Sequence, residues 1–338
     1  MRELLKTEHL SVSFFTKAGE VEAVRDVSLT VEEGEVLAIV GESGCGKSAL
    51  CKSIMKLLPK TAKIKSGKIL ADGIDITDYT QRNMSRLRGD LFSMIFQDPM
   101  TSLNPTMTIG KQIEEAVRIH NKKMPKKQVK KKVLELMQLV EIDEPEVRIS
   151  QYPHEFSGGM RQRAVMAIAL AGNPKILFAD EPTTALDVTI QAQILDVFRR
   201  IQKKLGMATV FISHDLGVVA GVADRVAVMY AGKIVEIGTA EEIFYDPRHP
   251  YTWGLLQSLP ILSKGKEWLP TLPGMPPTLI HPPKGDAFAE RNAYAMRIDY
   301  EKEPPMFQVT DTHYAATWLL DERAPEVKAP IGERRYGK

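Results

Sequence analysis

One segment, Gly41-Glu-Ser-Gly-Cys-Gly-Lys-Ser48, constrains the fold more than any other because of what stands on either side of it. The apolar run Val36–Val40 precedes it and is typical of a strand that is buried on both faces. The residues that follow, 48–58, have the pattern of a helix. A strand, a glycine-rich turn and a helix in this order are the context that the pattern G-x-x-x-x-G-K-S/T requires. The sequence therefore predicts an α/β fold of the P-loop NTPase class.

The residue types of this loop match what phosphate binding needs. Gly41, Gly44 and Gly46 let the backbone approach a phosphate group and turn its amides inward. We expect Lys47 to reach the β- and γ-phosphates of a nucleotide and Ser48 to ligate Mg²⁺. The expected ATP-binding set is the loop with its flanking residue, namely Gly41, Glu42, Ser43, Gly44, Cys45, Gly46, Lys47, Ser48 and Ala49.

A second apolar run, Ile176–Asp180, ends in a carboxylate, and Glu181 follows it directly. Because the carboxyl ends of parallel strands meet at one edge of a sheet, we expect Asp180 beside the phosphate loop, where it can hold Mg²⁺ through water. Glu181 is then suited to act as the general base for an attacking water. Adjacent acids after a strand are more often turn or cap residues, but the phosphate loop upstream reverses that expectation.

A third motif, Ser157-Gly-Gly-Met160, opens a stretch with helical pattern over residues 160–170. Serine and paired glycines at a helix N-terminus make a second nest of backbone amides that can bind an anion. A protein with one phosphate loop of its own does not need two such nests. The chain at this point resembles the nucleotide-binding subunit of ABC transporters, whose signature sequence is similar to Ser157–Met160 followed by Arg-Gln-Arg.

This resemblance implies the remaining site residues, which follow in the family's order. They are Gln97 as the Q-loop residue, Ala185–Asp187 with Asp187 as the D-loop, His214 as the switch histidine, and Phe14 rather than Phe15 as the aromatic that stacks on adenine. Glu181, His214 and Gln97 form the expected catalytic set. Ser48, Gln97 and Asp180 form the expected magnesium site.

The resemblance also implies partners. In the family, two such domains pack head to tail, so Ser157, Gly158, Gly159 and Met160 would act on the ATP of a second ABC ATPase subunit. We expect a heteromer, with a homodimer as the alternative, together with two integral membrane permease subunits and, indirectly, an extracytoplasmic solute-binding protein. The expected location is peripheral, on the cytoplasmic face of the cell membrane. A formal net charge of +2 gives no reason to expect nucleic acid as a partner.

The domain organisation follows from changes in pattern along the chain. Alternating residues before position 36 predict a small antiparallel sheet, residues 100–170 predict a helical subdomain, and residues 226–238 predict a hairpin. We expect an ABC nucleotide-binding domain over 1–245. Residues 246–338 are rich in proline and are expected to form a C-terminal extension outside the core.

Three segments resemble the oligopeptide, dipeptide and nickel importer subunits more narrowly, namely residues 98–105, 249–256 and 272–277. In that group the extension usually carries four cysteines for an iron–sulfur cluster. Here Asp286, Asn292, Asp299 and Ala316 stand in those places, and the chain has no cysteine beyond Cys51, which excludes the cluster. Packing of aromatic and other apolar side chains is expected to hold the extension instead, through Phe288, Tyr294, Met296, Tyr314 and Trp318.

The expected function is ATP hydrolysis that powers uptake of a di- or oligopeptide, with oligosaccharide or nickel import as alternatives. No apolar run reaches the roughly 18 to 20 residues that cross a bilayer, so other chains would have to span it. A soluble ABC protein acting on DNA or ribosomes is less favoured, because it would need a long coiled-coil insertion or two cassettes in one chain. A P-loop kinase would need an acceptor site in place of the signature at Ser157–Met160.

Overall fold

The computed structural model describes residues 2–98, 102–184, 186–259 and 272–330. These residues fall into two compact units, which are described separately. The first unit contains residues 78–212 together with the short segments 1–4 and 31–36. The second unit contains residues 5–30, 37–77 and 213 onwards.

The first unit is built on parallel strands in the order β6 (Phe92–Ile95), β7 (Ile176–Asp180) and β8 (Ala208–Ser213). Every residue of β7 and β8 is buried, and burial on both faces explains the continuous apolar run that predicts β7. Helix α8 (Val188–Leu205) connects them. It buries Ile194, Val197, Phe198 and Ile201, the spacing of one helical face.

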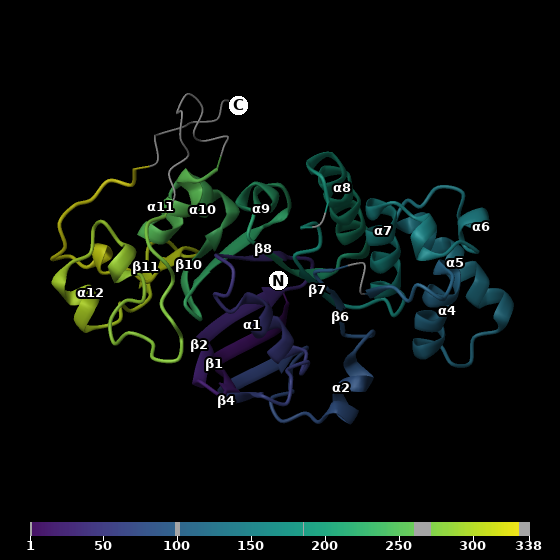
Figure 1. Cartoon of the computed structure of the whole chain (residues 1–338), viewed down its shortest axis with the longest axis horizontal. Helices are drawn as coiled ribbons and strands as arrows, with labels where there is room; N and C mark the ends of the chain where they lie inside the picture. The colour runs from purple at the N-terminus through teal and green to yellow at the C-terminus, as the bar shows by residue number, and fades with distance from the viewer. Residues whose placement is uncertain (1, 99–101, 185, 260–271, 331–338) are drawn as a thin grey trace. The chain divides into compact units, whose positions relative to one another are not determined.

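The other helices of this unit lie between β6 and β7 in the chain. They are α4 (Ile109–His120), α5 (Lys126–Leu139), α6 (Pro145–Arg148), η1 (Pro153–Glu155) and α7 (Gly158–Ala169), and α2 (Gln81–Leu87) precedes β6. Helices α4, α5 and α7 contact one another, and α7 also contacts α8 (Figure 1). This confirms the expected helical segment between residues 100 and 170.

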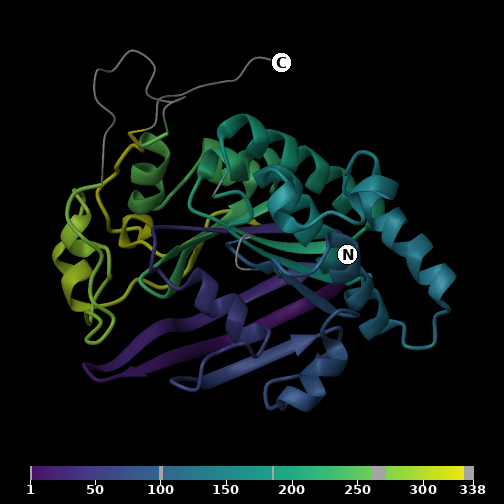
Figure 2. The ribbon, with the colours of Figure 1, turned by 45° about the vertical axis from the view of Figure 1, so that its right-hand side comes forward.

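The second unit contains a four-stranded antiparallel sheet in the order β2-β1-β4-β5, in which β1 lies between β2 and β4 (Figure 2). Its strands are β1 (Glu3–Thr16), β2 (Gly19–Glu32), β4 (Ala62–Ala71) and β5 (Ile74–Asp75). The antiparallel sheet predicted for the start of the chain is therefore present.

A second group of strands in this unit begins with β3 (Val36–Val40), which pairs in parallel with β9 (Arg225–Tyr230). Strands β9 and β10 (Lys233–Thr239) form the predicted hairpin, closed at Ala231 and Gly232. Helix α9 (Leu216–Val222) precedes β9, and α10 (Ala240–Tyr245) follows β10. The parallel and antiparallel strands together confirm the predicted α/β class.

Helix α1 (Lys47–Ile54) is shorter than the 48–58 pattern suggested. Its C-terminus is closed by Lys56 at a φ of 53° and by a hydrogen bond from the Leu57 amide to the Lys52 carbonyl oxygen at 2.7 Å. A left-handed residue with this backbone bond is the usual way to end a helix. The periodicity continues past the end of the helix, so periodicity alone overestimated its length.

The expectation that the proline-rich segment lies outside the core is wrong. Strand β12 (Tyr314–Ala315) pairs with β10, and β11 (Phe307–Gln308) pairs with β12. The ring of Tyr251, in α11 (Pro250–Gln257), lies 4.6 Å from the ring of Tyr230, and Phe288 packs on both. The prolines did not prevent this packing, since Pro250, for example, occupies the first turn of α11, where proline is well tolerated.

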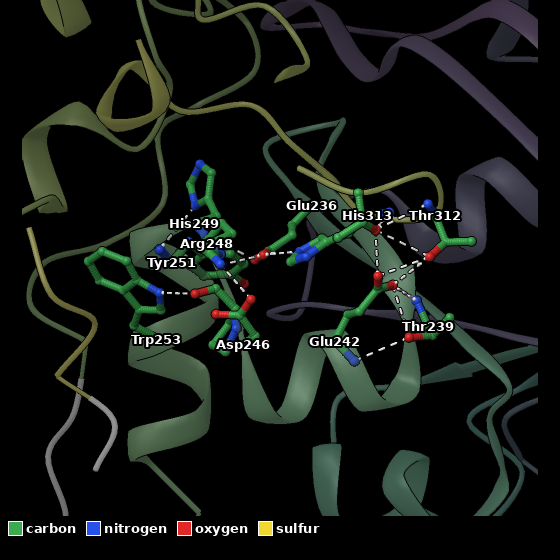
Figure 3. Close-up of polar contacts among 12 residues, drawn as sticks. Glu236, Thr239, Glu242, Asp246, Arg248, His249, Tyr251, Trp253, Thr312 and His313 are labelled. Carbon is green, nitrogen blue, oxygen red and sulfur yellow. Dashed lines mark hydrogen bonds and ion pairs between the residues drawn. The ribbon is translucent and has the colours of Figure 1, made fainter. Parts of the chain in front are cut away.

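Packing of the expected apolar and aromatic residues is also only part of what holds this segment. Among them Phe288 is buried, whereas Tyr294, Met296, Tyr314 and Trp318 are only half-buried. A buried polar cluster around Glu236 also connects this segment to the strands (Figure 3). The fully buried Glu236 accepts from the His249 amide at 3.1 Å and contacts His313 Nε2 at 2.8 Å, which joins β10 to the start of β12.

His249 is expected to make part of the protein's stability dependent on pH. Burial lowers the pKa of His249 to about 3, and its Nδ1 accepts from the Tyr251 amide at 3.0 Å to cap α11. In the unfolded chain the imidazole of His249 is protonated below a pKa of about 6.5, whereas in the folded chain it stays neutral down to about 3. The free energy of unfolding therefore decreases progressively as the pH falls from 6.5 towards 3. Burial raises the pKa of Asp286 to about 6, which acts in the opposite direction.

A comparison with His249→Asn isolates this histidine, because Asn also caps a helix but does not titrate. We expect the variant to be less stable than the wild type at pH 7, with the gap narrowing by about 2 kcal/mol at pH 5. Urea unfolding of both proteins at the two pH values measures this, and the contribution of Asp286 cancels in the difference. A gap that stays constant would show that His249 is not buried in its neutral form.

Candidate functional site

The glycine-rich loop joins β3 to α1, as its motif predicts, and steric contacts explain two of its glycines. A Cβ on Gly41, which has a φ of 149°, would lie 2.1 Å from the Met229 carbonyl oxygen. A Cβ on Gly46, which has a φ of 110°, would lie 2.2 Å from the Ala23 carbonyl oxygen. Neither contact is tolerable, so the loop can pass this close to its neighbours only with glycine at both positions.

Lys47 lies against this loop. Its side chain is 5% exposed, and its Nζ donates to the carbonyl oxygens of Gly41 at 2.7 Å and Glu42 at 2.9 Å. Burial raises the pKa of the neighbouring thiol of Cys45. The lysine ammonium is therefore held against the carbonyl oxygens of the loop. Of the two candidate aromatics, Phe14 is half-buried, whereas Phe15 is 40% exposed with Lys63 and Lys65 over its ring.

In the first unit, the structure brings together two of the three predicted catalytic residues. Asp180 ends β7 and is buried, and Glu181 follows it with a φ of 48°. The Glu181 carboxylate oxygen Oε2 accepts from Gln97 Nε2 at 2.9 Å and from Thr184 Oγ1 at 3.1 Å. A left-handed backbone is uncommon for glutamate and is found at sites where the surrounding structure holds it in place.

The third predicted catalytic residue, His214, belongs to the second unit and is exposed directly after β8. The adjacent Asp215 caps α9 by accepting from the Gly217 amide at 2.8 Å. The phosphate loop also belongs to the second unit, whereas Asp180, Glu181 and Gln97 belong to the first. The predicted site residues are therefore distributed over both units.

The Ser157–Met160 motif opens α7, as the sequence predicts. Ser157 caps the helix, with its Oγ accepting from the Met160 amide at 3.3 Å. A Cβ on Gly159 would lie 2.7 Å from Ile190 Cγ2 of α8, so glycine permits the close approach of these two helices. Ser157 and Gly158 are exposed, which leaves this helix N-terminus accessible.

The D-loop residue Asp187 caps α8 by accepting from the Ile190 amide at 3.0 Å. Ala185, in the same predicted D-loop, lies outside the described residues, and so do residues 99–101 of the segment that resembles the peptide and nickel importers. In the part of the chain that is described, no helix has the length and hydrophobicity needed to cross a membrane.

Sequence reasoning missed two residues that contact the phosphate loop, Arg291 and Tyr251. Arg291 forms a bidentate ion pair with Glu42, at 2.6 Å and 2.9 Å, and the Glu42 amide donates to Tyr251 Oη at 2.8 Å. Both come from the segment after residue 245, far along the chain from the loop. The one available signal was a charged residue, Glu42, at a position where the loop motif accepts any residue.

Comparison with known proteins agrees with this fold. The family model described as ABC transporter matches residues 24–184, and the model described as oligopeptide/dipeptide transporter, C-terminal region, matches residues 235–298. Among solved structures, a dimeric ATP-binding cassette in a post-hydrolysis state, bound to ADP and Pi, is 26% identical with a TM-score of 0.63. The match covers 70% of this chain and 99% of that one. The structure of cbiO1 of Clostridium perfringens, part of the ABC transporter complex cbiONQ, matches with a TM-score of 0.64 and 28% identity over 73% of this chain and 92% of its own.

The fold and the site thus define an ATPase of the ABC type, and the chain belongs to the ABC transporter family. More narrowly, it belongs to the family of oligopeptide and dipeptide transport ATP-binding proteins. It is 60% identical to the oligopeptide transport ATP-binding protein OppD of Bacillus subtilis, over 97% of this chain and 92% of that protein. It is 58% identical to the dipeptide transport ATP-binding protein DppD of Lactococcus lactis, over 96% of this chain and 93% of that protein.

Proposed function

We propose that this chain is the ATP-hydrolysing subunit of a multisubunit importer whose cargo is a di- or oligopeptide. The observation that carries the proposal is likeness over nearly the whole chain to proteins named for oligopeptide or dipeptide transport. The match of residues 235–298 to the C-terminal region of such transporters supports it further. Uptake of a labelled oligopeptide by the assembled transporter tests it, because cargo class is what separates peptide import from oligosaccharide or nickel import.

In this proposal the phosphates of ATP lie on the loop between β3 and α1. Amides of the loop and the N-terminus of α1 contact the phosphate oxygens, and Lys47 supplies a positive charge. The contacts of Lys47 with the Gly41 and Glu42 carbonyl oxygens support this role, since they place the ammonium at the loop. Phe14 is the proposed aromatic partner of the adenine ring.

The proposed magnesium site consists of Ser48, Asp180 and Gln97. Each offers oxygen atoms, which are the ligands that Mg²⁺ prefers, so the donor set fits the ion. Asp180 is 3% exposed at the end of β7. Gln97 donates a hydrogen bond to Glu181 through its Nε2, and this contact does not involve its amide oxygen. When bound, Mg²⁺ neutralises charge on the β- and γ-phosphates.

Glu181 is the proposed general base for the attacking water. Its carboxylate accepts hydrogen bonds from two neutral donors, Gln97 and Thr184, which help to fix its orientation. A carboxylate held in this way can accept a proton from water. His214 is proposed to contact the γ-phosphate and orient the same water.

We further propose that the chain forms a dimer with a second ABC ATPase subunit. We expect a different chain as this partner, with a homodimer as the alternative. Ser157, Gly158, Gly159 and Met160 would then contact the ATP of the partner, and the exposed N-terminus of α7 supports this. The dimer would act on two permease subunits from the cytoplasmic face of the membrane. The proposed domain boundary remains at residue 245, with 246–338 as the C-terminal extension.

The C-terminal extension is proposed to hold no iron–sulfur cluster. Three of the residues that stand in place of cysteines are buried and accept hydrogen bonds from nearby backbone amides. Asp286 accepts from Phe288 at 2.9 Å, Asn292 from Tyr294 at 2.9 Å, and Asp299 from Met296 at 2.6 Å. Such bonds stabilise the turns that each residue begins or closes.

Purified protein is therefore expected to be colourless. We expect no visible absorbance of an iron–sulfur cluster even after anaerobic preparation with iron and sulfide, because the chain has no thiolate beyond Cys51. An absorption spectrum and an iron determination measure this. Iron bound in stoichiometric amount would contradict the proposal.

A further inference from the structure

The C-terminal extension contacts the phosphate loop through a buried ion pair. The Arg291 side chain, at the end of the short helix η3 (Ala289–Arg291), is 4% exposed. Its Nη1 and Nη2 donate to the two carboxylate oxygens of Glu42 at 2.6 Å and 2.9 Å. This two-point geometry gives a stronger and more directional contact than a single charged hydrogen bond.

The guanidinium of Arg291 is fixed on its other sides as well. Its Nε donates to the Pro273 carbonyl oxygen at 2.7 Å, and its Nη1 donates to Tyr230 Oη at 3.2 Å. It also lies over the rings of Tyr230 and Phe288, 5.7 Å and 5.9 Å from their centroids. Contacts other than the one with Glu42 therefore already fix the position of the Arg291 guanidinium.

A second contact holds the backbone at the same loop residue. The Glu42 amide donates to Tyr251 Oη at 2.8 Å, and the Tyr251 ring is fully buried against Tyr230 and Phe288. The Glu42 carbonyl oxygen accepts from Lys47 Nζ at 2.9 Å. Glu42 is thus held by the extension through its side chain and its amide, while its carbonyl oxygen contacts Lys47, the proposed phosphate-binding lysine.

The charge on Glu42 matters because it belongs to a loop that binds a polyanion. A carboxylate without a counter-ion would repel the phosphates of ATP, and a partly buried position weakens the screening by water. Arg291 cancels this charge and pins the loop residue next to it. Without Arg291, the loop would keep its sequence but would carry an uncompensated negative charge.

We propose that Arg291 is a positioning residue for ATP binding, which neutralises Glu42 and fixes the start of the phosphate loop. The C-terminal extension is then not only a structural attachment but also sets the affinity of the ATPase for nucleotide. The proposal rests on ATP binding by the loop and does not depend on which cargo is transported.

ATP titrations of the full-length chain test this with three variants. We expect Arg291→Gln to weaken ATP binding about tenfold, the effect of one charged contact of this kind. Glu42→Gln should weaken ATP binding less than Arg291→Gln does, because it removes the carboxylate that would repel ATP and keeps an amide oxygen that can accept from Arg291. The double variant should recover most of the affinity lost in Arg291→Gln, since neither charge remains.

The ionic strength gives a second readout that a purely structural role would not change. The deficit of Arg291→Gln should shrink as salt is added, because salt screens the repulsion between Glu42 and ATP. Arg323→Gln is the matched control, because Arg323 pairs with Asp321 on the surface of the same extension. It should bind ATP like the wild type.

The outcomes distinguish the two roles of Arg291. Rescue by the second substitution, with a deficit that falls with salt, supports neutralisation of Glu42. Affinity of Arg291→Gln within twofold of the wild type would overturn the proposal, and a double variant as weak as Arg291→Gln would overturn the neutralisation of Glu42. If Arg291→Gln does not fold, Glu42→Gln still tests neutralisation, because a tenfold loss of ATP affinity in a variant that lacks the repelling charge would overturn that role.

Discussion

Glu181→Gln is expected to bind ATP but to lose turnover by about 10²-fold or more, the usual cost of removing a general base. Glutamine has nearly the same shape as glutamate and keeps a carbonyl oxygen that can accept from Gln97 and Thr184, as Glu181 Oε2 does here. It cannot take a proton from water at neutral pH. The change should therefore remove the chemistry and leave the surrounding contacts in place.

Steady-state ATPase activity and ATP titration measure the two halves of this prediction. Glu135→Gln serves as the control, because Glu135 is an exposed residue of α5 away from the predicted motifs. It should hydrolyse ATP like the wild type. If Glu181→Gln kept ATPase activity within threefold of the wild type, another residue would have to be the base.

Lys47→Ala is expected to weaken ATP binding, the step that precedes hydrolysis. The Lys47 ammonium is held against the phosphate loop by the Gly41 and Glu42 carbonyl oxygens, and alanine cannot supply this charge. Losing a charge-assisted contact with phosphate costs about 2 kcal/mol or more, which is over tenfold in affinity. The smaller side chain also leaves those carbonyl oxygens without their donor.

Equilibrium titration with ATP measures this effect. Lys52→Ala is a suitable control, because Lys52 lies in the last turn of the same helix and is half-buried there. It should leave ATP affinity unchanged. Wild-type affinity in Lys47→Ala would count against phosphate binding at this loop.

Short motifs allowed much of the site to be predicted from sequence. The loop needs glycine at positions 41 and 46 because of local steric contacts, and such requirements leave a recognisable pattern. The same holds for Ser157, which caps the helix that its own motif opens. Strand β7 was predictable because burial on both faces requires continuous apolar residues.

The role of the extension could not be predicted in this way. Arg291 and Glu42 are separated by 249 residues, and no pattern near either one indicates the other. Proline content correctly indicated that long helices are absent from the described part of the extension, but it carries no information on where an irregular segment packs. The pairing of β12 with β10 depends in part on the buried contact between Glu236 and His313, which are also far apart in sequence.

The most direct test of the account is peptide uptake by the complete transporter in proteoliposomes, with its permeases, partner ATPase and solute-binding protein. We expect a labelled oligopeptide to accumulate only with ATP, and we expect accumulation to stop when this chain carries Glu181→Gln. Nickel and an oligosaccharide, offered in the same way, should not accumulate. Accumulation of either of these in place of the peptide, or peptide uptake undiminished by Glu181→Gln, would contradict the account.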